Sequence, residues 1–161
     1  MKTLIIPITL MIMTFGAGAQ EITVYENFES YKHLLNKNND TTYVINYWAT
    51  YCAPCIKEMP VFKRLENEYS GKKMEIILTS LDFGGNPKEK VRSFMNRHGV
   101  KSRVVILDDP DSNSWIDKVS TQWSGALPGT LIYNNNFREF YEQTFTYDEI
   151  NSILKSKMIK P

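Results

Sequence analysis

Cysteine and histidine are scarce in this chain, which carries two of each among its 161 residues. A protein metal site draws on three or four ligands, and His33 and His98 are far from the cysteines in sequence, so no metal site is predicted. Acidic and basic residues nearly balance, with a formal net charge of +1, and they are interspersed. This charge pattern excludes electrostatic recruitment of nucleic acid or of anionic lipid.

Long hydrophobic runs are also lacking. The apolar stretch 4–15 is shorter than the roughly 20 residues that a spanning helix needs. It follows Lys2 and precedes Ala17-Gly18-Ala19, which has the pattern of a signal-peptide cleavage site. We therefore expect a signal peptide at 1–19, export to the bacterial periplasm, and one domain at 20–161. An uncleaved membrane anchor stays open as the alternative.

The remaining chain has the composition of one globular domain, because 42% of the residues are hydrophobic and 23% are charged. Its strand-like and helix-like segments alternate, which indicates the α/β class with a mixed central sheet and helices on both faces. Strand-like segments are 22–25, 43–48, 74–81, 103–107 and a hairpin of 130–133 with 137–141. Helix-like segments are 28–35, the stretch after 52, 87–98, a weaker one around 115–119, and the stretch after 146. Asn86 as an N-cap and Gly99 as a stop delimit the segment 87–98, and Thr146 with Glu149 predicts a capping box for the last helix.

Both cysteines lie in the run Cys52-Ala53-Pro54-Cys55, between the apolar strand 43–48 and an amphipathic helix. Two cysteines three positions apart at a helix start can form a disulfide with little backbone movement. Backbone N–H groups and the helix dipole favour the thiolate form of Cys52. A bridge that closes so short a loop removes little entropy from the unfolded chain, so the pair is predicted to serve redox chemistry rather than stability.

The sequence around this pair, Asn46 to Pro60, resembles the active site of the thioredoxin superfamily, in particular its exported TlpA/ResA-like branch. Pro54, Cys55, Glu58 and Pro60 match the Pro-Cys-x-x-Glu-x-Pro continuation of that branch. The resemblance implies a thioredoxin fold over the whole domain. It also implies that segment 86–107 is the helix-strand insertion characteristic of the branch.

A second match is the run Gly125-Ala126-Leu127-Pro128-Gly129-Thr130, which is similar to the cis-proline loop of the superfamily. It implies a cis peptide bond before Pro128, with the proline opposite the dithiol and the Leu127 backbone free to pair with an extended substrate. Threonine commonly follows this proline, so Gly129 predicts a wider or more flexible groove. The predicted substrate-binding residues are Trp48, Tyr51, Pro54, Leu127 and Pro128. For Trp48, a place in the core is the alternative.

The resemblance implies a thiol-disulfide oxidoreductase in which Cys52 attacks a substrate disulfide and Cys55 resolves the mixed disulfide. No cofactor beyond the Cys52–Cys55 pair is expected. The expected partners are protein thiols and disulfides of the cell envelope, with the chain as their reductant and a membrane electron donor to recharge it. Classical thioredoxins carry a buried aspartate where this chain has Asn46, so another acid must accept the proton. Asp82 is the first candidate and Glu58 the weaker one, although Asp82 also fits an exposed acid at a strand end.

Two other functions stay open. One is a binding module that kept the fold while its dithiol became redox-inactive, and the other is a copper-handling protein. The joint presence of both cysteines and the proline loop favours the enzyme.

Overall fold

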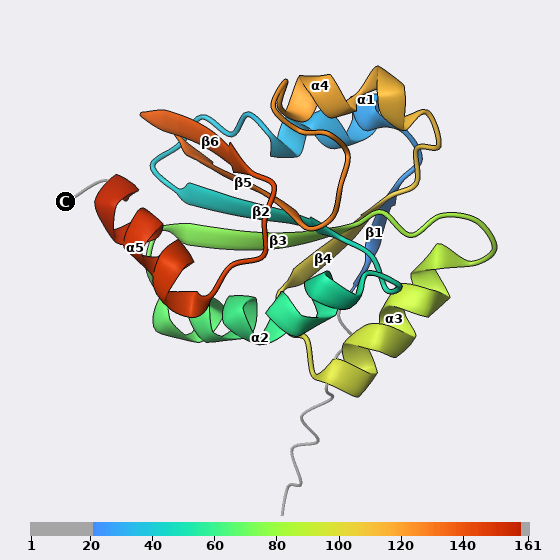
Figure 1. Ribbon diagram of the computed structural model, residues 1–161, viewed down its shortest axis with the longest axis horizontal. Coiled ribbons are helices and arrows are strands. Elements are labelled where there is room, and N and C mark those ends of the chain that lie inside the picture. The colour runs from blue at the N-terminus through green and yellow to red at the C-terminus, as the bar shows by residue number, and fades with distance from the viewer. Residues whose placement is uncertain (1–20, 159–161) are drawn as a thin grey trace, which may run out of the picture.

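A six-stranded mixed sheet lies at the centre of the computed structural model, which describes residues 21–158 (Figure 1). The strands are β1 (Thr23–Tyr25), β2 (Thr42–Trp48), β3 (Met74–Ser80), β4 (Arg103–Leu107), β5 (Gly129–Asn134) and β6 (Phe137–Tyr141). Their order is β1-β4-β3-β2-β5-β6, in which the first four run parallel and β5 and β6 are antiparallel to their neighbours. The predicted mixed sheet is confirmed.

Helices cover both faces of this sheet, as predicted (Figure 1). On one face lie α1 (Phe28–Tyr31), which continues into a 3-10 turn (Lys32–Leu34), and α4 (Ile116–Val119), which follows the 3-10 turn Ser112–Ser114. On the other face lie α2 (Ala53–Glu68), α3 (Pro87–His98) and α5 (Tyr147–Lys157).

The central strand β2 explains why there are two hydrophobic cores. All seven of its residues are buried, as expected of a strand covered on both sides. Because side chains alternate along a strand, Val44 and Trp48 join the core under α2 and α3, whereas Ile45 and Tyr47 join the core under α1 and α4. The carboxyl end of β2 therefore emerges between two packed layers.

The predicted insertion forms α3 and β4, and β4 pairs between β1 and β3. The Asn86 side chain caps α3 by accepting the N–H of Glu89, and Gly99 ends the helix with a left-handed φ of 60°. At the far end of the domain, Thr146 and Glu149 form the predicted capping box of α5. These local signals worked because the groups that satisfy each helix end lie within one turn of it.

The signal peptide and the alternative membrane anchor were predicted at 1–19, which lies outside the described residues. Between residues 21 and 158, no helix combines the length and the apolar character needed to cross a bilayer.

Candidate active site

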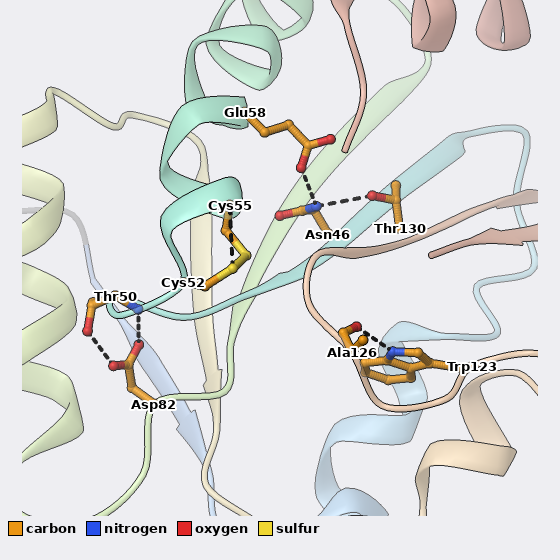
Figure 2. Close-up of a disulfide and its surroundings, with 9 residues drawn as sticks. All are labelled: Asn46, Thr50, Cys52, Cys55, Glu58, Asp82, Trp123, Ala126 and Thr130. Atoms are coloured by element: carbon orange, nitrogen blue, oxygen red, sulfur yellow. Dashed lines mark hydrogen bonds between the residues drawn. A yellow bond between two sulfur atoms is a disulfide. The ribbon is translucent and has the colours of Figure 1, made fainter. Parts of the chain in front are cut away.

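Cys52 and Cys55 form a disulfide at the start of α2, with their Cα atoms 5.3 Å apart (Figure 2). Cys52 is the N-cap residue of the helix, and its sulfur accepts the N–H of Cys55 at 3.3 Å. Its own N–H donates to the carbonyl of Ala49 at 3.1 Å, which folds the chain back sharply after β2. Cys52 is 9% exposed and Cys55 only 1%, an order that agrees with their predicted roles as outer and inner sulfur.

Asp82 fastens the loop before the disulfide to the end of β3. Its carboxylate accepts the N–H of Thr50 at 2.9 Å, the Thr50 hydroxyl at 2.5 Å and the Ser80 hydroxyl at 2.7 Å. In Figure 2, Asp82 and Thr50 lie on the other side of the disulfide from Glu58. Asp82 is 2% exposed, so the exposed strand-end alternative is wrong. Three donors already bind this carboxylate, which therefore holds the loop in place.

Glu58 is the acid that lies behind the inner cysteine. It is 1% exposed and follows Cys55 by three positions on α2, which places both side chains on one face of the helix. Its carboxylate accepts the N–H of Phe145 at 2.6 Å and the Asn46 amide at 3.4 Å (Figure 2). The same amide nitrogen donates to the hydroxyl of Thr130 at 3.1 Å.

Burial makes this carboxyl group easy to protonate. Loss of solvent raises the pKa of Glu58 from 4.5 to about 7, and the hydrogen bonds from Phe145 and Asn46 offset part of the effect. An acid with such a pKa exchanges protons near neutral pH. The two candidate acids thus differ in their surroundings: Glu58 is buried with a raised pKa, whereas the Asp82 carboxylate is bound by three donors of the adjacent loop and strand.

Strand pairing brings the proline loop, residues 125–130, close to the loop after β2 that carries the cysteines. Gly129 pairs with Tyr47 and Thr130 pairs with Asn46, so the residue before β5 reaches the end of β2. The bond between Leu127 and Pro128 is cis, as the resemblance implied. The Trp123 indole donates to the carbonyl of Ala126 at 2.9 Å and holds this loop (Figure 2).

The other predicted substrate-binding residues differ in exposure. Tyr51 is 66% exposed beside Cys52, Pro54 is exposed, and Leu127 is half-buried. Trp48 is 0% exposed and packs on the ring of Phe94 with 4.9 Å between ring centroids. The structure therefore favours the core alternative for Trp48.

The expectation that Gly129 widens the substrate groove is wrong. A Cβ atom at this position would lie 2.7 Å from Cζ of Phe140 and 3.3 Å from Nε1 of Trp123. Both rings are held, because they pack on each other with 5.1 Å between centroids. The space that a threonine side chain would need is already filled by aromatic side chains of the core under α1 and α4.

Sequence reasoning missed several residues that build the site: Thr50, Trp123 and Phe145. Trp123 is two residues before the proline loop, and its indole N–H, which needs an acceptor when buried, was a usable signal. Phe145 acts through its backbone N–H group, and such a contact leaves no trace in the residue type. Thr50 donates both its N–H and its hydroxyl to Asp82, a partner 32 positions away.

Neither His33 nor His98 belongs to a group of described side chains that could bind a metal ion. The His98 ring stacks on Phe94 at 4.2 Å between centroids, and Nδ1 of His33 is 2.7 Å from the carbonyl of Ser30. Within residues 21–158, no three His, Cys, Asp or Glu side chains are grouped closely enough to hold a metal ion.

Comparison with known proteins agrees with this geometry. Residues 19–132 match the family model described as Redoxin. The chain is 29% identical over 140 residues to the thiol-disulfide oxidoreductase ResA of Geobacillus thermodenitrificans, covering 86% of this chain and 74% of that protein.

Solved structures share the fold at lower identity. A thioredoxin-related protein from Neisseria meningitidis serogroup B aligns with a TM-score of 0.62 and 18% identity, over 73% of this chain and 85% of that one. A thioredoxin family protein from Chlorobium tepidum, described as a thiol:disulfide interchange protein, aligns with a TM-score of 0.62 and 15% identity, over 79% and 84%. The thioredoxin fold is thereby confirmed.

The raised pKa of Glu58 predicts a pH-dependent stability. The folded protein binds a proton here that the unfolded chain releases above its ordinary pKa of 4.5, so the free energy of unfolding should fall as the pH rises towards about 7. The full difference corresponds to about 3 kcal/mol. Urea denaturation of the oxidised protein between pH 4 and 8 measures it. Glu58→Gln should remove this slope, and a variant that keeps the whole slope would contradict the assignment.

The filled space beside Gly129 predicts that Gly129→Thr destabilises the fold. Inserting atoms into a packed region costs about 1–3 kcal/mol, which urea denaturation detects. Gly129→Thr should cost less stability in a Phe140→Ala background than in the wild-type protein, because the clashing ring is then absent. Equal losses in both backgrounds would mean that Phe140 is not the obstacle.

Proposed function

The chain belongs to the redoxin family, and from this premise we propose that it reduces disulfides of other proteins in the cell envelope. It is a thiol-disulfide oxidoreductase. The observation that carries this conclusion is the Cys52–Cys55 disulfide at the start of α2, next to the loop of Pro128. The relatives named thiol-disulfide oxidoreductase ResA support the same chemistry.

The reduced pair acts in two exchanges. The Cys52 thiolate attacks one sulfur of the substrate disulfide, forms a mixed disulfide and releases the other sulfur as a thiolate. Cys55 then attacks the Cys52 sulfur, which restores the disulfide seen in the structure and releases the second substrate thiolate. Two electrons pass from the dithiol to the substrate. An electron donor, which we propose to be membrane-bound, must then reduce the pair again.

The second exchange needs a base, because Cys55 is buried and attacks as a thiolate. We assign this role to Glu58, whose ionised carboxylate takes the thiol proton and becomes a carboxylic acid. Its burial and its pKa of about 7 support the assignment, since proton transfer is efficient when the pKa lies near the working pH. Asp82 is assigned to positioning the loop through Thr50.

The envelope location and the protein partners extend this proposal. They rest on the pattern of residues 1–19 and on the resemblance to the exported TlpA/ResA-like branch, with protein thiols and disulfides as the reaction partners. A groove between Tyr51 and the Leu127 backbone would accept an extended chain.

Substitution of each cysteine should separate the two exchanges. In insulin reduction driven by dithiothreitol, wild type should show turnover and Cys52→Ser should fall to the uncatalysed rate, because the attacking sulfur is gone. Cys55→Ser should accumulate a mixed disulfide with the substrate, which intact mass spectrometry detects. Absence of catalysis in the wild-type protein would favour the redox-inactive binding module instead.

The two acids should differ in the pH profile of reduction. Glu58→Gln should slow the reaction by about 100-fold at neutral pH and remove the inflection near pH 7, because the proton acceptor is lost. Asp82→Asn loses acceptor capacity toward Thr50 and Ser80, so it should lower stability by about 1–3 kcal/mol and keep the inflection. The opposite pattern of inflections would return the role to Asp82. Kinetics from pH 5 to 9 provide the comparison.

A further inference from the structure

Exposed aromatic side chains concentrate at one place beside the disulfide. In the part of the chain from 21 to 158, the exposed large hydrophobic side chains are Tyr51 and Phe83, at 66% and 64%. Both line the same cavity, which has a volume of about 240 Å³ and a floor that includes Trp115 and Trp123. Since apolar cavities of about 150 Å³ bind benzene, this one is large enough for a bulky side chain.

The cavity adjoins the groove where the substrate disulfide must react. Tyr51 precedes Cys52 directly, and Leu127, another lining residue, precedes the cis-proline. The Tyr51 and Leu127 side chains thus belong both to the expected substrate surface and to the cavity. An extended segment joined to Cys52 and paired with the Leu127 backbone would therefore pass the mouth of this cavity.

The chemistry of the walls defines what fits. The lining is apolar except for Ser112 and Asp109, and Asp109 is its one charged residue. The carboxylate of Asp109 is fixed because it accepts the N–H groups of Phe28 at 2.8 Å and Asp111 at 3.1 Å. A fixed negative charge at an apolar cavity favours a basic group nearby and disfavours an acidic one.

We propose that this cavity binds a large apolar side chain, aromatic or branched aliphatic, from the substrate segment that carries the reactive cysteine, and favours a basic residue next to it. The proposal rests on the proposed function and adds a selection rule to it. Because the exposed Tyr51 and Phe83 rings flank the opening, burial of such a side chain also covers apolar surface that water now contacts. The partner is therefore a protein segment in extended form, which presents its side chains singly.

The test uses mixed disulfides between glutathione and short peptides that contain one cysteine. A single Phe is moved from three positions before the cysteine to three positions after it in an Ala-Ser background, and the residue beside Phe is Lys or Glu. At one position, Phe should raise kcat/KM about tenfold over Ala, with Lys preferred over Glu. Reduction of oxidised glutathione by the wild-type protein is measured in parallel.

Two variants in the same 3-10 turn provide the matched comparison. Ser112→Trp places an indole in the cavity and should bring the Phe-to-Ala ratio close to one. Asn113→Trp adds the same bulk at an exposed neighbour outside the lining and should keep the ratio. Circular dichroism checks that Ser112→Trp is folded. Phe83→Ala, at an exposed site of the cavity, is a second test that does not depend on that fold, and it should lower the Phe-to-Ala ratio partially.

The outcomes separate the two proposals. Equal rates for all peptides, with glutathione disulfide still reduced, overturn the cavity assignment and leave the oxidoreductase in place. Absence of reduction of every disulfide overturns the proposed function itself. A wild-type dimer in sedimentation that Phe83→Ala dissociates would place a second copy on the cavity and also overturn the assignment.

Discussion

The pairing of β2 with β3 on one side and with β5 on the other determines where each group of the site lies. The carboxyl end of β2 leads into the disulfide, the end of β3 supplies Asp82, and the start of β5 brings the proline loop and Thr130. A slip of β5 by one residue against β2 would turn the Thr130 side chain away from Asn46, because side chains alternate along strands. The buried register of β2 thus fixes the geometry of the site.

Much of the fold was predictable because its signals are local. The cap at Asn86, the stop at Gly99 and the capping box at Thr146 each involve groups within one helical turn, and the structure has them where the sequence indicated. The covered strand β2 was readable from its continuous apolar character. The family resemblance contributed what local signals could not, namely that the segment around Pro128 lies at the end of this strand.

The hydrogen-bond partners of the two candidate acids were not predictable, because most of these partners are distant in the sequence. Asp82 follows β3, as expected, but its hydrogen bonds go to Thr50 and Ser80. Glu58 gains its character from burial by segments that are distant in sequence, including Phe145, 87 positions away. Gly129 was misread for the same reason, since the ring that fills its space comes from β6.

The contact between Glu58 and the N–H of Phe145 ties the redox centre to the connection between β6 and α5. That connection includes Gln143 and Thr144, which are exposed and far from both sulfurs along the chain. The backbone conformation of this connection determines how well the Phe145 N–H is placed to donate to the Glu58 carboxylate. Substitutions in this exposed connection would therefore change the surroundings of Glu58, while the loop that carries the cysteines keeps its sequence.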